Sequence, residues 1–277
     1  MHEIAEYVYR THANIHLPNS FLPTTSADKM SLCKGCISGV RHEGIPEGRI
    51  EKIGGYDTYV ALPTADYPKD KAVLFFTDVF GAQFVNNQLL ADDFARNGFQ
   101  VYMPDYFHGD GLPANAMNDD KFDRAAWMAK HAPETAKPVV DAVVNALKEK
   151  GITRFGTLGY CYGAIFVFSL GIENITHVSV VAHPSRIAVP DDLQKYKAHS
   201  QAPLLINSCE VDRAFPQEAQ KAADDILGDG KFAPGYERTY WEGCEHGFAV
   251  RGDMSNPKVK AGKEGAFKAS VEFLLKL

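Results

Sequence analysis

The sequence predicts an α/β domain with a mostly parallel sheet and helices on both of its faces. Strand-like and helix-like segments alternate along most of the 277 residues, an order typical of parallel sheets. Several strand-like segments are continuous apolar runs, as expected for strands buried on both faces. The composition, 45% hydrophobic and 23% charged, is that of an ordinary globular protein.

The first half of the chain begins this alternation. Residues 56–62 alternate aromatic or apolar side chains with small ones, which predicts a strand. Residues 71–77, KAVLFFT, read as a buried strand. Residues 86–97 place apolar side chains at helical spacing, and Gly98 follows as a stop signal. A strand, a loop rich in Gly, Pro and His, and two helices are then expected at 99–103, 105–117, 121–130 and 133–149.

The second half continues the pattern. A strand expected at 154–160 leads through a short turn into a helix that starts over 164–170. The later strands are expected at 178–182, 203–208 and 236–241, and the later helices at 216–227 and 261–277. No internal repeat interrupts this order, so residues 33–277 are predicted to form one domain, with a glycine-rich, turn-like start. Residues 1–32 show no steady period and are interpreted as an irregular N-terminal extension.

Charge and composition exclude several classes of function. The chain carries 29 basic and 35 acidic side chains, a net charge of −6, without a cluster of Lys and Arg. Nucleic-acid binding is therefore not expected. No apolar stretch is long enough to span a membrane, and the N-terminus lacks the apolar core of a secretory signal. An odd number of cysteines, five, favours a reducing compartment, and we expect a cytoplasmic protein.

The sequence does not predict a metal or a cofactor. Cys33 and Cys36 form one Cys-x-x-Cys pair, but a structural zinc site needs four ligands and no second pair exists. The glycines form neither a dinucleotide-binding nor a P-loop pattern.

Residues 159–163, Gly-Tyr-Cys-Tyr-Gly, match the nucleophile-elbow pattern, with cysteine where serine is commoner. The pattern lies between a predicted strand and a predicted helix, which is the context that the motif requires. An elbow would place Cys161 at a helix N-terminus, where the helix dipole favours a thiolate. The amide of Tyr162 would then be one oxyanion donor. The alternative is a buried structural cysteine.

Partners for such a nucleophile follow in the expected order, acid and then histidine. Asp212 comes just after the strand at 203–208, and His246 follows the last predicted strand. Glu210 is the competing acid. The loop after residues 71–77 should supply a second oxyanion donor, the amide of Val79 or, as a second choice, that of Phe80.

Several motifs in the same order resemble the dienelactone hydrolase family, α/β-hydrolase folds with a Cys-His-Asp triad. They are TDVFG at 77–81, PDYFHGD at 104–110, GYCYGA at 159–164, AHPS at 182–185, EVDRAFP at 210–216 and EHGFAVRGD at 245–253. The entry segment over 35–63 resembles the fungal branch of the family. The resemblance implies an α/β-hydrolase fold over residues 33–277.

The resemblance also implies roles for individual residues. Cys161 would be the nucleophile, His246 the base and Asp212 its orienting acid. Asp78 stands where the family prototype has a glutamate that takes the thiol proton. Arg251 lies one position beyond the family's carboxylate-binding arginine, and Arg124 is a candidate second cation. The side chains expected to line a substrate pocket are Phe80, Tyr106, Tyr160, His183, Phe215 and Arg251.

The function expected from these residues is hydrolysis of a small-molecule lactone or carboxylic ester through an acyl-thioester on Cys161. One alternative uses the same intermediate for polyketide release or lactonisation. Another is a non-catalytic ligand-binding protein on the hydrolase fold. A homodimer is compatible with the sequence, which does not decide the oligomeric state.

Overall fold

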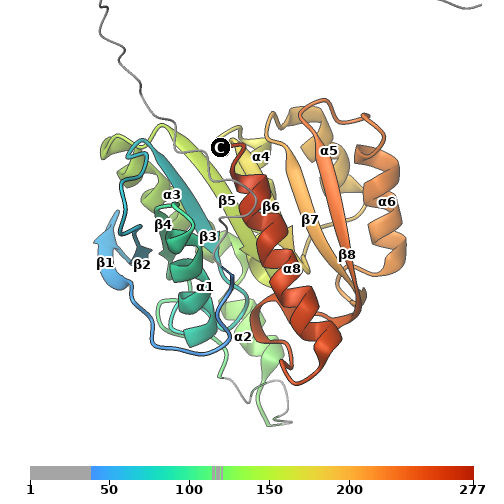
Figure 1. Cartoon of the computed structure of the whole chain (residues 1–277), viewed down its shortest axis with the longest axis horizontal. Helices are drawn as coiled ribbons and strands as arrows, with labels where there is room; N and C mark the ends of the chain where they lie inside the picture. The colour runs from blue at the N-terminus through green and yellow to red at the C-terminus, as the bar shows by residue number, and fades with distance from the viewer. Residues whose placement is uncertain (1–38, 114–115, 117–118, 120) are drawn as a thin grey trace, which may run out of the picture. The chain divides into compact units, whose positions relative to one another are not determined.

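The computed structural model describes residues 39–113, 116, 119 and 121–277 (Figure 1). The extension expected at 1–32, as well as Cys33 and Cys36, lies outside these described residues.

The described chain is built on an eight-stranded sheet in the order β1-β2-β4-β3-β5-β6-β7-β8. β1 pairs antiparallel with β2, β2 pairs antiparallel with β4, and every other neighbouring pair is parallel. The strands are β1 (Arg49–Ile53), β2 (Tyr56–Ala61), β3 (Lys71–Phe76), β4 (Val101–Pro104), β5 (Arg154–Tyr160), β6 (Val178–Ala182), β7 (Leu204–Val211) and β8 (Tyr236–Glu245).

Helices cover both faces of this sheet, so the predicted architecture is confirmed. One face carries α1 (Val85–Arg96), α7 (Phe248–Arg251) and α8 (Pro257–Leu274); α1 and α8 lie in front of the sheet in Figure 1. The other face carries α2 (Arg124–Lys130), α3 (Pro133–Glu149), α4 (Ala164–Ile172), α5 (Asp191–His199) and α6 (Gln217–Leu227). Two apolar clusters fill the space between the sheet and these layers.

Among the strands and α-helices of the described residues, three were not predicted: β1, α5 and the four-residue α7. β1 lies in the segment expected to be turns; its side chains are largely polar and exposed at the sheet edge, so it lacks the alternation that marks a strand. It is formed by antiparallel pairing across a turn at Gly54 and Gly55, both with positive φ. α5 was not predicted, because Leu193 and Tyr196 are its only buried side chains.

β7 and β8 are longer than expected. They extend to Val211 and Glu245, so that Asp212 and His246 follow them directly. Across the described ranges, with their gaps, no helix has the length and apolar character needed to cross a membrane.

Candidate active site

The carboxyl ends of the central parallel strands bring the predicted site residues to one edge of the sheet. Asp78 lies just beyond β3, Cys161 beyond β5 and His183 beyond β6, and Asp212 and His246 follow β7 and β8. Open α/β sheets bind their ligands at this edge.

Cys161 occupies the sharp turn that the elbow motif predicts. Its φ is +50°, in the left-handed region, and it begins the short 3-10 helix η1 (Cys161–Gly163) that leads into α4. A Cβ on Gly163 would overlap the carbonyl oxygen of Phe76 in β3, and one on Gly159 would lie 2.6 Å from Cγ2 of Val167 in α4. The two glycines therefore let strand and helix pack close enough to form the turn.

Cys161, His246 and Asp212 form a continuous chain of contacts. Sγ of Cys161 lies 3.0 Å from Nε2 of His246, and Nδ1 of the same ring lies 2.9 Å from Oδ1 of Asp212. That oxygen also accepts hydrogen bonds from the amides of Ala214 and Phe215, at 2.8 and 3.0 Å. The buried carboxylate is thus held by its own loop and directed at the imidazole.

The surroundings of His246 favour its charged form. Burial lowers the pKa of the imidazole, but the hydrogen bonds to Asp212 and to Cys161 outweigh burial and raise the pKa to about 10. The competing acid Glu210 is exposed and accepts a hydrogen bond from the Gly243 amide at 2.6 Å. Of the two candidate acids, the structure therefore brings Asp212 to the histidine.

Asp78 and Arg251 form a second polar pair in the site. Nη1 of Arg251 lies 3.2 Å from Oδ2 of the fully buried Asp78, whose Oδ1 accepts hydrogen bonds from Asn87 Nδ2 and the Phe80 amide. Burial raises the pKa of Asp78, and Arg251, Asn87 and the Phe80 amide oppose this effect. The Phe80 amide is thereby engaged, which favours the amide of Val79 as the oxyanion donor from this loop.

Three of the predicted pocket side chains lie close to these groups. The Arg251 guanidinium stands 4.9 Å from the centre of the Phe80 ring, and the Tyr106 hydroxyl donates to the carbonyl of Thr77 at 2.7 Å. His183 packs edge-to-face on His246, with ring centres 5.0 Å apart. Burial, followed by the neighbouring His246 and Arg251, holds the pKa of His183 well below its ordinary value.

Tyr160 lies away from the expected pocket, whereas Phe215 lies on the same side of the sheet as Cys161. Strand alternation directs Tyr160 to the sheet face opposite that of Cys161, where it stacks on Phe75 with ring centres 5.0 Å apart. Phe215 lies on the same face as Cys161 and is fully buried in the apolar cluster there. The structure therefore gives Tyr160 a packing role, whereas the place of Phe215 in a pocket stays a prediction. Arg124, the candidate second cation, donates to the carbonyl of Ala116 at 3.0 Å.

Sequence reasoning missed two polar residues of the site. Asn87 is fully buried at the start of α1 and bonds both Asp78 and the carbonyl of Gly81. Ser185 places its hydroxyl 3.5 Å from Sγ of Cys161. Asn87 could have been identified from the sequence, because it is a polar residue on the predicted buried side of α1. Ser185 was part of the AHPS motif, but no role was assigned to it.

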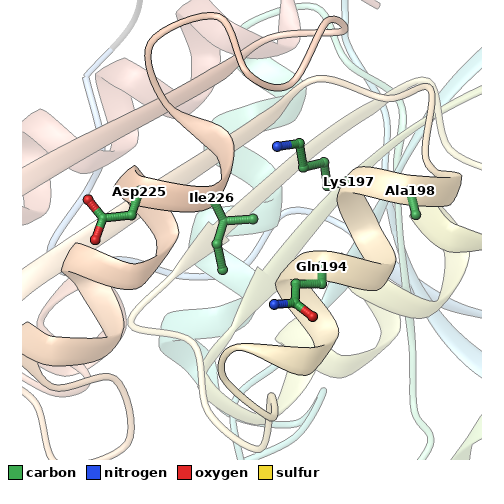
Figure 2. Close-up of a pocket in the computed structure, with 5 residues that line it drawn as sticks. All are labelled: Gln194, Lys197, Ala198, Asp225 and Ile226. Atoms are coloured by element: carbon green, nitrogen blue, oxygen red, sulfur yellow. The ribbon is translucent and has the colours of Figure 1, made fainter.

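The largest of the cavities described lies beside His246. Its volume is about 1070 Å³, and its wall includes His246, Arg251, Arg213 and Glu245. A groove of about 540 Å³ between α5 and α6 contains none of the predicted residues (Figure 2). In the part of the chain that the structure describes, no three His, Cys, Asp or Glu side chains are grouped as metal ligands would be.

The sequence profile of the dienelactone hydrolase family matches residues 56–277. The chain belongs to the dienelactone hydrolase family. Its family relatives include the hydrolase pyvD of Aspergillus violaceofuscus, 35% identical over 85% of this chain and 93% of the relative. Hydrolase tropI of Talaromyces stipitatus is 34% identical, over 86% and 93% of the two chains. Dienlactone hydrolase 1 of Gibberella moniliformis is 32% identical, over 90% and 94%.

Solved structures show the same fold at low sequence identity. A putative dienelactone hydrolase from Klebsiella pneumoniae superposes with a TM-score of 0.63 at 15% identity, over 82% of this chain and 96% of the other. The dienelactone hydrolase-like promiscuous phosphotriesterase P91 gives 0.61 at 16% identity, over 84% and 98%. The predicted family and α/β-hydrolase fold are both confirmed, and as a dienelactone hydrolase family member the protein is a lactone or ester hydrolase.

Proposed function

We propose that this dienelactone hydrolase family protein cleaves small carboxylic esters or lactones through an acyl-thioester on Cys161. The observation that carries the proposal is the chain of contacts from Sγ of Cys161 to His246, 3.0 Å, and from His246 to Asp212, 2.9 Å. Nucleophile and base lie within hydrogen-bond reach, and a third group orients the base, the arrangement that covalent catalysis needs.

The first step is transfer of the thiol proton from Cys161 to Nε2 of His246. The resulting imidazolium is stabilised by the Asp212 carboxylate, in keeping with the raised pKa of His246. His246 is the proton acceptor in this scheme because the oxygens of Asp78 are engaged with Arg251, Asn87 and the Phe80 amide. Asp78 then acts by holding Arg251 at the site rather than by taking the proton.

The thiolate next attacks the carbonyl carbon of the substrate, and a C–S bond forms. The amides of Val79 and Tyr162 would hold the negative oxygen, each contributing roughly 2.7–4 kcal/mol. As the C–O bond breaks, His246 gives its proton to the departing oxygen. For a lactone, that oxygen stays attached to the acyl chain.

Water then completes the cycle. His246 removes a proton from the water as it attacks the thioester, the C–S bond breaks, and the sulfur recovers a proton from the imidazolium. If an internal hydroxyl of the substrate replaced water, the same intermediate would instead yield a lactone. Product analysis with substrates that carry or lack such a hydroxyl separates these two outcomes.

The test combines substitution with trapping. Cys161→Ala and His246→Ala should each lose several orders of magnitude in turnover of p-nitrophenyl acetate and of a lactone panel. Rapid-quench mass spectrometry should find the acyl adduct on the peptide that contains Cys161. The control is Cys244→Ala, which removes a buried cysteine whose Sγ contacts the Lys258 carbonyl. Near-parent turnover by Cys161→Ala would overturn the mechanism, and absence of turnover in the parent would favour a ligand-binding protein.

A further inference from the structure

Ser185 contacts the nucleophile at two points. Its hydroxyl oxygen lies 3.5 Å from Sγ of Cys161, and its amide donates to the Cys161 carbonyl at 3.0 Å. Ser185 is 9% exposed and Cys161 is 7% exposed, so water has little access to the contact between them. The backbone contact holds the main chain of Ser185 beside Cys161, and in this position the side chain places its hydroxyl next to the sulfur.

The turn that presents Ser185 follows β6 and has an unusual backbone. His183 and Arg186, which flank Pro184 and Ser185, have φ angles of +37° and +59°. Non-glycine residues rarely adopt such φ angles. Where these angles are found, they are concentrated at functional sites, because the surrounding structure must hold the strained backbone in place. Here the turn carries the hydroxyl back toward the end of β5 and the elbow.

A thiolate at this position needs hydrogen-bond donors, because it is a buried negative charge. His246 supplies one donor, the protonated Nε2, at 3.0 Å. A hydroxyl can rotate to donate or accept, so Ser185 can accept from the neutral thiol and donate to the thiolate. A bond to the charged form is the stronger of the two.

We propose that Ser185 is a further catalytic residue, whose hydroxyl donates a hydrogen bond to the thiolate of Cys161. The inference rests on the proposed function, in which that sulfur carries negative charge twice. It does so before attack on the substrate, and again when the C–S bond of the thioester breaks and its electron pair returns to sulfur. Ser185 stabilises both states without forming or breaking a covalent bond.

Other charged or titratable groups also surround the sulfur and its histidine, and each remains when the Ser185 hydroxyl is removed. They are His246, Asp212, His183, Asp78, Arg251 and Tyr106. A change in the titration of Cys161 in a Ser185 variant therefore reports the hydroxyl itself.

The experiment measures thiolate formation without turnover. The rate of Cys161 alkylation by iodoacetamide is followed from pH 5 to 10, with mass spectrometry of the peptide that contains Cys161. Ser185→Ala should raise the apparent pKa of Cys161 by about one, a tenfold smaller thiolate fraction on the lower limb of the profile. The same variant should lower kcat for p-nitrophenyl acetate roughly tenfold and leave KM nearly unchanged.

Two further comparisons separate this role from packing. Ser185→Thr keeps a hydroxyl and should restore the alkylation profile, whereas Ser185→Val has nearly the same shape and should not. If Ser185→Ala fails to fold, the comparison of Ser185→Thr with Ser185→Val still shows whether the hydroxyl stabilises the thiolate. The matched control is Ser270→Ala, which removes a buried hydroxyl that donates to the Ala266 carbonyl at 2.7 Å in α8. It should leave the profile of Cys161 unchanged.

Three results would overturn the proposal: a parent-like alkylation profile in Ser185→Ala, equal profiles in Ser185→Thr and Ser185→Val, or an equal change in Ser270→Ala. Failure of the proposed function is a separate result, since it is seen as retained hydrolysis by Cys161→Ala. Alkylation of the parent protein still reports the Ser185 hydrogen bond in that case.

Discussion

Replacing Asp212 by Asn removes a negative charge while keeping an oxygen where the structure needs one. A single oxygen, Oδ1, accepts from His246 Nδ1 and from the amides of Ala214 and Phe215. An asparagine amide oxygen can occupy that place, so His246 keeps a hydrogen-bond acceptor at Nδ1 and therefore its tautomer. We expect Asp212→Asn to lower kcat/KM mainly through the lost charge.

The size of the loss follows from the pKa of His246. The contacts raise this pKa from 6.5 to about 10, which at 1.36 kcal/mol for each pKa unit corresponds to about 5 kcal/mol. Asp212 and Cys161 both contribute, so the share of Asp212 is on the order of 2–3 kcal/mol, or a loss of roughly 30- to 150-fold. This is smaller than the loss of about 10⁴ seen where the tautomer is also wrong.

The assay is the pH dependence of p-nitrophenyl acetate hydrolysis. Because the raised pKa keeps His246 protonated until the pH rises through about 10, the imidazolium–thiolate pair should persist to alkaline pH in the parent. In Asp212→Asn the imidazolium–thiolate pair should be lost at a lower pH than in the parent. The control is Glu210→Gln, which changes the exposed competing acid and should be parent-like. Parent-like activity in Asp212→Asn, or a large loss in Glu210→Gln, would refute the assignment, and a 10⁴-fold loss would refute the single-oxygen argument.

Three other substitutions test the elbow, a buried charge and the second polar pair. Gly163→Ala should lower Tm and cost about 1–3 kcal/mol, because its Cβ meets the Phe76 carbonyl oxygen; Gly39→Ala, with no atom within 4 Å, should be neutral. Burial lowers the pKa of Lys263 from 10.5 to about 8, so the folded state loses this proton before the unfolded state does, and this group makes stability rise between those pH values. Urea unfolding of Lys263→Met at pH 7 and pH 10 should lack that rise, and an unchanged pH dependence would contradict the lowered pKa. Asp78→Asn should reduce kcat/KM more than Asp78→Glu, because only the asparagine variant leaves Arg251 without its buried carboxylate partner. Equal, parent-like values of kcat/KM in both variants would exclude the proposed role of Asp78.

Several features were predictable from the sequence because short-range sterics and apolar patterning determine them. β5 and β6 were predicted with the bounds that the structure has, and β3 to within one residue, since its apolar run KAVLFF marks a strand buried on both faces. The elbow was predictable because glycine is required wherever β3 and α4 approach the turn. Asp212 and His246 were identified as candidates from their places after predicted strands.

Elements at the sheet edge and on the surface were harder to predict from the sequence. β1 and α5 bury few apolar side chains, so neither leaves a clear period in the sequence. Tyr160 and Phe215 were expected in a pocket because an aromatic residue near a motif suits a pocket and a core equally well. For Tyr160, only the observed side of the sheet separates these two roles.

The sequence by itself determined the family, the sheet architecture and the candidate nucleophile, acid and base, because these depend on local residue patterns. Tertiary structure decided which charged groups meet. Arg251 reaches Asp78 across 173 positions of chain, and Ser185 reaches Cys161 across 24. Such pairings arise only when parallel strands align their carboxyl ends at one edge of the sheet, since no local pattern records which loops will then be neighbours.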